Sequence, residues 1–189
     1  MKKVLLPGIL GGLLVFIWSA IAHMVLPIGG MGLKTILSTE DTVLKAMKEN
    51  IQESGLYFMP GHDLSRQPTE EEMKKYEQGP TAFLVYHPTG VKAMSVGQLL
   101  RQLLFDLLAG LIAAFIVSLT VASLGMRALA VTLIGLFAWL TVTAPHWNWY
   151  RFPAAFTIGE GIDGVIGWLL GGLLIAWLVQ RAEKRAAAV

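Results

Sequence analysis

Residues 103–144 read LLFDLLAGLIAAFIVSLTVASLGMRALAVTLIGLFAWLTVTA, and this stretch decides the fold class. It holds two apolar runs, residues 103–124 and 128–144, which are separated by a short connection at Met126 and Arg127. A helix needs about 20 predominantly apolar residues to cross the hydrocarbon core of a bilayer. The stretch therefore predicts a hairpin of two membrane-spanning helices.

Two further apolar runs, residues 4–27 and 162–179, complete a set of four candidate spans. Hydrophobic residues make up 54% of the 189-residue chain, charged residues only 15%, and the mean hydropathy is +0.59. Soluble domains average about 25% charged residues. We therefore expect an all-α membrane protein, a four-helix transmembrane bundle with a small α+β extracytoplasmic domain inserted between spans 1 and 2. The expected divisions are 1–28, 29–98 and 99–189, the last with a short cytoplasmic tail.

The distribution of Lys and Arg predicts the orientation. If all four runs span the membrane, one side receives these basic residues: Lys2, Lys3, Arg127, Arg181, Lys184 and Arg185. Because positively charged loops are retained in the cytoplasm, both termini are expected there, in a bacterial inner membrane. The first run also fits a cleaved signal peptide, since Ala20-Ile21-Ala22 has the small-x-small pattern of a cleavage site. Its continuation to Leu26 favours a retained anchor.

The inserted segment carries signals for short helices and strands. Three pairs with capping-box spacing predict helix starts, namely Ser38 with Asp41, Thr69 with Glu72, and Ser95 with Gln98. Aromatic and β-branched residues predict strands at 56–59 and 81–87. Pro88-Thr89-Gly90 predicts the turn of a hairpin that returns through residues 91–94. We therefore expect a small folded domain.

Ionisable side chains near the outer ends of the spans are the candidate site, because such groups are costly in a membrane. They are His23, Asp106, His146, Arg151, Glu160 and Asp163. In one interpretation they form a structural layer, with Asp106 paired to His23, Arg101, His146 or Arg151. In the other, His23, Asp106, His146 and Asp163 bind a divalent metal or move protons. The spacing matches no local metal motif, so the structural interpretation is favoured, with no catalytic residue and no cofactor.

Glycines at helical spacing in the spans predict close packing between helices. They are Gly8, Gly12, Gly110, Gly164, Gly167 and Gly171, and the last two form a GxxxG pair.

Three short motifs carry a family resemblance: GLYFMPG at 55–61, FLVYHP at 83–88 and WNWYRFP at 147–153. With them, the chain resembles uncharacterised four-span bacterial integral membrane proteins. The resemblance implies the four-span architecture and no particular activity.

Charge and cysteine content exclude several function classes. A net charge of +2, dispersed along the chain, does not suit nucleic acid binding. The absence of cysteine excludes disulfides and thiolate metal sites.

We expect a non-enzymatic accessory or assembly subunit that contacts membrane lipid and binds other membrane proteins or a second copy. The alternative is a membrane-embedded metal-dependent enzyme, or a proton or metal site, at the outer interface.

Overall fold

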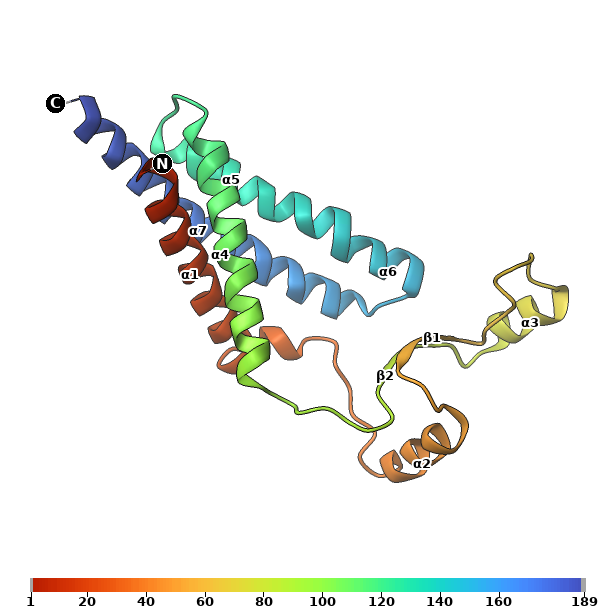
Figure 1. The fold of residues 1–189 in the computed structure, drawn as a ribbon. Coiled ribbons are helices and arrows are strands. Elements are labelled where there is room, and N and C mark those ends of the chain that lie inside the picture. Colours follow the sequence, from red (N-terminus) through yellow and green to blue (C-terminus); the bar gives the residue numbers. More distant parts are fainter. Residues whose placement is uncertain (1, 188–189) are drawn as a thin grey trace. The chain divides into compact units, whose positions relative to one another are not determined.

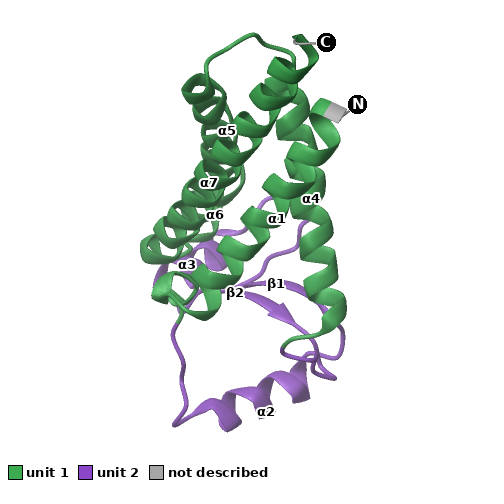
Figure 2. Ribbon diagram, turned by 90° about the vertical axis from the view of Figure 1, so that its left-hand side faces the viewer, with its two compact units in different colours: residues 1–33, 94–189 green, residues 34–93 purple. Residues whose placement is uncertain are grey.

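The computed structural model describes residues 2–187, whose helices and strands are labelled in Figure 1. The chain divides into two compact units. One comprises residues 1–33 and 94–189, and the other comprises residues 34–93 (Figure 2). The inserted unit is thus somewhat shorter than the expected 29–98.

Four helices of the first unit are long and apolar enough to cross a membrane, as expected. They are α1 (Lys2–Met24), α4 (Val96–Ser118), the continuous stretch α5–η2–α6, and α7 (Ala154–Ala187). Within the third, α5 is Leu124–Ala138, η2 is a π-helical turn at Trp139–Thr143, and α6 is Ala144–Tyr150. A short 3-10 helix, η1 (Pro27–Gly30), follows α1.

Two spans, α7 and the α5–η2–α6 stretch, are longer than the apolar runs that predicted them. The 34 residues of α7 extend about 51 Å at 1.5 Å per residue, more than the roughly 30 Å of a hydrocarbon core. Hydropathy locates only the part of a helix that suits lipid, so residues 162–179 underestimate it. The hairpin connection was also misplaced, because α4 and α5 are joined by residues 119–123. Ser123 caps α5 by accepting from the Met126 amide, which puts Arg127 inside the helix.

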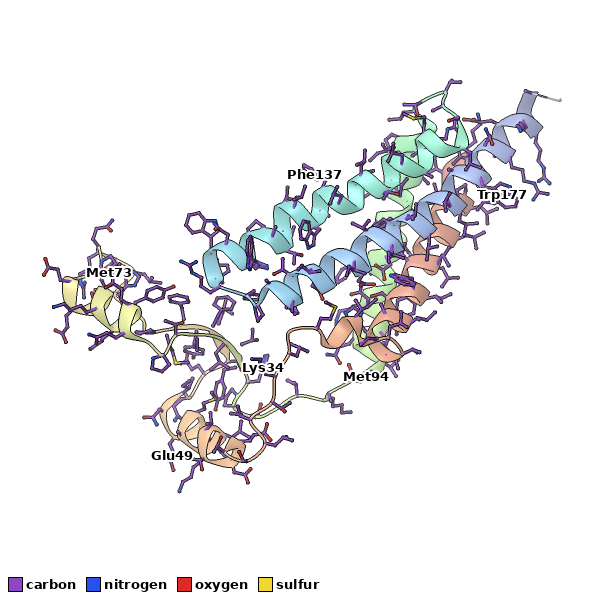
Figure 3. The ribbon with its side chains drawn as sticks, turned by 180° about the vertical axis from the view of Figure 1, so that it is seen from behind. Lys34, Glu49, Met73, Met94, Phe137 and Trp177 are labelled. Atoms are coloured by element: carbon purple, nitrogen blue, oxygen red, sulfur yellow. The ribbon has the colours of Figure 1, made fainter. Side chains whose placement is uncertain are left out.

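The four spans form an open arrangement instead of a closed bundle. α1 packs against both α4 and α7, while α5 packs along α7. α4, α5 and α7 share one buried cluster, made of Ala113, Ala114, Val117, Val131, Ile175 and Val179. It lies toward the end that carries both termini, and toward the other end α4 and α5 diverge (Figures 1 and 3).

The second unit contains α2 (Glu40–Asn50), β1 (Gly55–Met59), α3 (Glu70–Gln78) and β2 (Ala82–Tyr86). β1 and β2 are antiparallel, with Gly55 opposite Tyr86 and Met59 opposite Ala82. The predicted hairpin through residues 91–94 is therefore wrong. β2 pairs with the strand on the far side of α3, where Leu, Tyr and Phe side chains suit a strand better than the Val-Lys-Ala-Met sequence of 91–94.

The expected helix starts are confirmed at two of three places. Complete capping boxes join Thr69 to Glu72 and Ser95 to Gln98. The third prediction, a helix start at Ser38, is wrong. α2 begins after Thr39, whose side chain forms no capping hydrogen bond.

Candidate functional site

His23 lies near the end of α1 between two carboxylates of α7. Its Nδ1 is 3.8 Å from Asp163 Oδ2, and its Nε2 is 3.9 Å from Glu160 Oε1. Nδ1 is also 3.0 Å from the Ser19 carbonyl oxygen. Because a carbonyl only accepts, this nitrogen carries the proton. A fully protonated ring would then face a carboxylate on each edge.

The η1 segment covers one side of the imidazole. A Cβ placed on Gly29 would lie 2.6 Å from His23 Cδ2, which is closer than real side chains approach. Glycine is therefore needed here for the chain to pass the ring.

Asp163 links α7 to α1 through two further hydrogen bonds. Ser19 Oγ donates to Asp163 Oδ2 over 3.3 Å, and Trp18 Nε1 donates to the Asp163 carbonyl over 3.1 Å. The other carboxylate oxygen, Oδ1, is buried and accepts no hydrogen bond from the residues that the structure describes. The site therefore retains an acceptor without a donor.

Ser19, His23 and Asp163 have the residue types of a nucleophilic triad but not its arrangement. Ser19 Oγ lies 3.5 Å from His23 Nδ1, the same nitrogen that faces Asp163. In a triad the serine contacts one ring nitrogen, which takes its proton, and the carboxylate contacts the other nitrogen and orients the ring. Here Nδ1 already donates to a carbonyl and cannot act as the base for Ser19.

Asp106 is buried on α4, and its partner differs from the expected ones. Gln102, one turn earlier, donates from Nε2 to both carboxylate oxygens, over 3.1 and 3.2 Å. Within residues 2–187 neither an arginine nor a histidine forms an ion pair with Asp106. A neutral amide on the same helix meets the need for a donor locally.

His146 and Arg151 lie in an aromatic environment. The His146 ring centroid is 5.7 Å from that of Tyr150 and 5.4 Å from that of Phe152. Arg151 ends α6 in the left-handed conformation, with φ at 59°. In the described part of the chain, no group of three His, Asp or Glu side chains is arranged to hold a metal ion. Among the six candidates, the ion pairs found in residues 2–187 join only His23 to Glu160 and His23 to Asp163.

The candidate packing glycines differ in their surroundings. A Cβ on Gly8 would lie 2.6 Å from Leu111 Cα, and Cβ atoms on Gly12 and Gly110 would strike backbone of the facing helix. On α7, a Cβ on Gly167 would lie 3.0 Å from Trp18, and one on Gly171 would lie 2.7 Å from Val15. Gly164 has no heavy atom within 4 Å of its added Cβ.

Sequence reasoning missed three contacts in which a tryptophan side chain packs against a glycine of a neighbouring helix. Trp18 lies on Gly167, Trp139 on Gly161, and Trp168 on Gly135, each on a neighbouring helix. Trp139 Nε1 also donates to the Thr157 carbonyl over 2.8 Å. Composition alone does not say which glycine an indole contacts.

A buried ion pair at the opposite end of the unit was also missed. Arg127 is 1% exposed, and its Nη2 donates to Glu183 Oε2 and to the Thr120 carbonyl, both over 2.8 Å. The signal was available, because Arg127 is the one charged residue in the sequence between Asp106 and Arg151.

Comparison with protein-family models, with curated proteins and with solved structures gives no match to this chain.

Proposed function

We propose that the chain is a non-enzymatic accessory or assembly subunit of a bacterial cytoplasmic membrane, which binds another membrane protein through its spans and needs no cofactor. The proposed topology has both termini in the cytoplasm and residues 34–93 outside. Its support is that Arg127 and the basic residues after Trp177 belong to the end of the unit that carries both termini (Figure 1). Basic residues are retained on the cytoplasmic side.

The observation that carries the proposed binding role is the environment of Gly164. At 100° per residue, Gly164 lies between the directions of Gly167, which faces α1, and Trp168, which faces α5. A glycine between two helices, with no atom near its Cβ, leaves room for the close approach of a further helix. α4 and α5 diverge toward the end of the unit that is opposite both termini (Figure 1).

The outer face of α5 supports the same role. The exposed apolar residues of α5 and the following η2 turn lie on a helical stripe, Leu129, Leu133, Phe137 and Leu140. Phe137 is 66% exposed and points away from α7 (Figure 3). We propose that the partner that approaches Gly164 also covers this stripe.

Photo-crosslinking in native membranes tests the proposal. A crosslinking amino acid at Phe137 should give a protein adduct, whereas the exposed Ile112 of α4 serves as the control. Gly164→Leu should abolish the Phe137 adduct and leave the chain folded, because it fills the partner's space and not that of a neighbouring helix. The proposal fails if Phe137 gives no more protein adduct than Ile112, or if Gly164→Leu leaves the adduct intact.

A second candidate function is proton or cation sensing by His23, and the observation that favours it is the pair of flanking carboxylates. Metal analysis of the purified chain separates the two candidates. Stoichiometric metal that is lost in both His23→Ala and Asp163→Asn would favour the second. Partner adducts that survive both substitutions would favour the first.

A further inference from the structure

Residues 34–93 have almost no core of their own. Tyr86, at 9% exposure, is the one buried residue among these 60, all of which the structure describes. Neither α2 nor α3 buries a residue. A two-stranded sheet is marginal in water, and three or more strands or a covering helix are needed for stability. Pairing with a further strand would therefore stabilise this unit.

The outer edge of β2 is suited to such pairing. The sheet contains only β1 and β2 in the described chain, so each strand has one edge without a neighbour. Natural edge strands are commonly protected by charged side chains, but residues 78–91 contain no Lys, Arg, Asp or Glu. Pro80 and Pro88 flank β2 and limit pairing to its five residues.

We propose that β2 pairs antiparallel with β2 of a second copy of this chain, about a two-fold axis at Leu84. This register places Ala82 opposite the partner copy's Tyr86 and Phe83 opposite its Val85. A small residue then faces a large one, and an aromatic residue faces a β-branched one, which are favourable cross-strand pairs. The result is a four-stranded sheet, β1–β2–β2–β1. The inference rests on the proposed function in taking residues 34–93 to be a protein-binding surface.

Other occupants suit this edge less well. The unit carries seven basic and nine acidic residues, so it lacks the basic face that anionic membrane surfaces attract. The β1 edge is preceded by the charged Glu53, whose carbonyl accepts from the Tyr57 hydroxyl over 3.0 Å. A second copy supplies an uncharged strand of matching length and pattern.

Disulfide trapping in the full-length chain tests the register, because the chain has no other cysteine. Directly opposite residues have Cα atoms about 4.5–5.5 Å apart, inside the roughly 4.4–6.8 Å that a disulfide spans. Leu84→Cys should therefore form a covalent dimer under mild oxidation in membranes. Val85→Cys is the matched control. Two copies of residue 85 would be diagonal neighbours about 7–8 Å apart, although Val85 is 67% exposed and Leu84 is half-buried.

We expect several-fold more dimer from Leu84→Cys than from Val85→Cys. Random collision would favour the more exposed Val85 instead. Equal yields, a larger yield from Val85→Cys, or no dimer from Leu84→Cys would overturn the inference.

A second measurement covers the case in which Leu84→Cys does not fold. In mild detergent, the mass of the complex should fall to the monomer in Val85→Lys, because the lysine lies beside apolar residues of the partner strand. Leu56→Lys should retain the dimer, since Leu56 pairs with Val85 on the same face but one strand further from the proposed edge. Equal masses for these two variants would contradict the inference. If the two masses are equal but the Phe137 adduct persists, the proposed function stands and only the β2 pairing is refuted.

Discussion

At the scale of single residues, glycines decide how closely the backbones of neighbouring helices approach. Gly110 faces the backbone of Gly8 and Gly12, so an added methyl group there forces two helices apart. We expect Gly110→Ala to destabilise the chain by about 1–3 kcal/mol, the usual cost of overpacking. Gly164→Ala, with open space at the same atom, should be neutral or stabilising by up to about 1 kcal/mol. Thermal unfolding in detergent measures both, and equal melting temperatures would contradict this account.

At the scale of elements, one ion pair joins the start of α5 to the end of α7. Glu183→Ala would leave the buried Arg127 without its carboxylate. We expect a loss of about 3 kcal/mol, the lower end of the range for breaking a buried pair, because Glu183 is 29% exposed. Glu183→Gln keeps an acceptor and should lose less, and Lys184→Ala should be nearly neutral. Denaturant unfolding in micelles tests this order, and a Glu183→Ala variant as stable as Lys184→Ala would refute it.

The start of α3 provides a pH-dependent element. Hydrogen bonds from the Arg66 guanidinium and the Thr69 amide lower the pKa of Glu72 to about 2, from an ordinary value of 4.5. A depressed pKa means that the stabilisation is complete above pH 4.5 and is lost as the pH falls toward 2. Hydrogen exchange of the α3 amides, corrected for intrinsic rates, should therefore quicken over that window. Glu72→Gln, which cannot titrate, should remove this pH dependence. An unchanged profile in Glu72→Gln would assign the effect to other groups.

At the scale of the whole molecule, the proposed topology makes a prediction about accessibility. A cysteine at Gln67 should react with an impermeant reagent in intact cells, and one at Ala187 should react only after lysis. The physical reason is the retention of basic residues on the cytoplasmic side. Labelling at Ala187 but not at Gln67 would invert the topology.

The sequence by itself determined the features that depend on local chemistry. Four spans are readable because crossing a bilayer demands a long apolar run, whatever the run packs against. The capping boxes at Thr69 and Ser95 were equally predictable, since both partners lie three residues apart. His23 and Asp163 were identified as candidates because ionisable residues are rare at such depth.

Only the tertiary structure decided which faces and strands meet. A span that is apolar all round gives a weak periodic signal for its contacts, so the open arrangement of α4, α1, α7 and α5 could not be predicted. For the same reason the sequence did not show that Glu183 is the partner of Arg127. The Gln102–Asp106 pair is different, because its members lie four residues apart on one helix and the spacing was available in the sequence. The pairing of β2 with β1 joins residues 23 to 31 positions apart, across α3. Strand patterns specify a pleated surface but not its neighbour, because that choice rests on packing between segments distant in the chain.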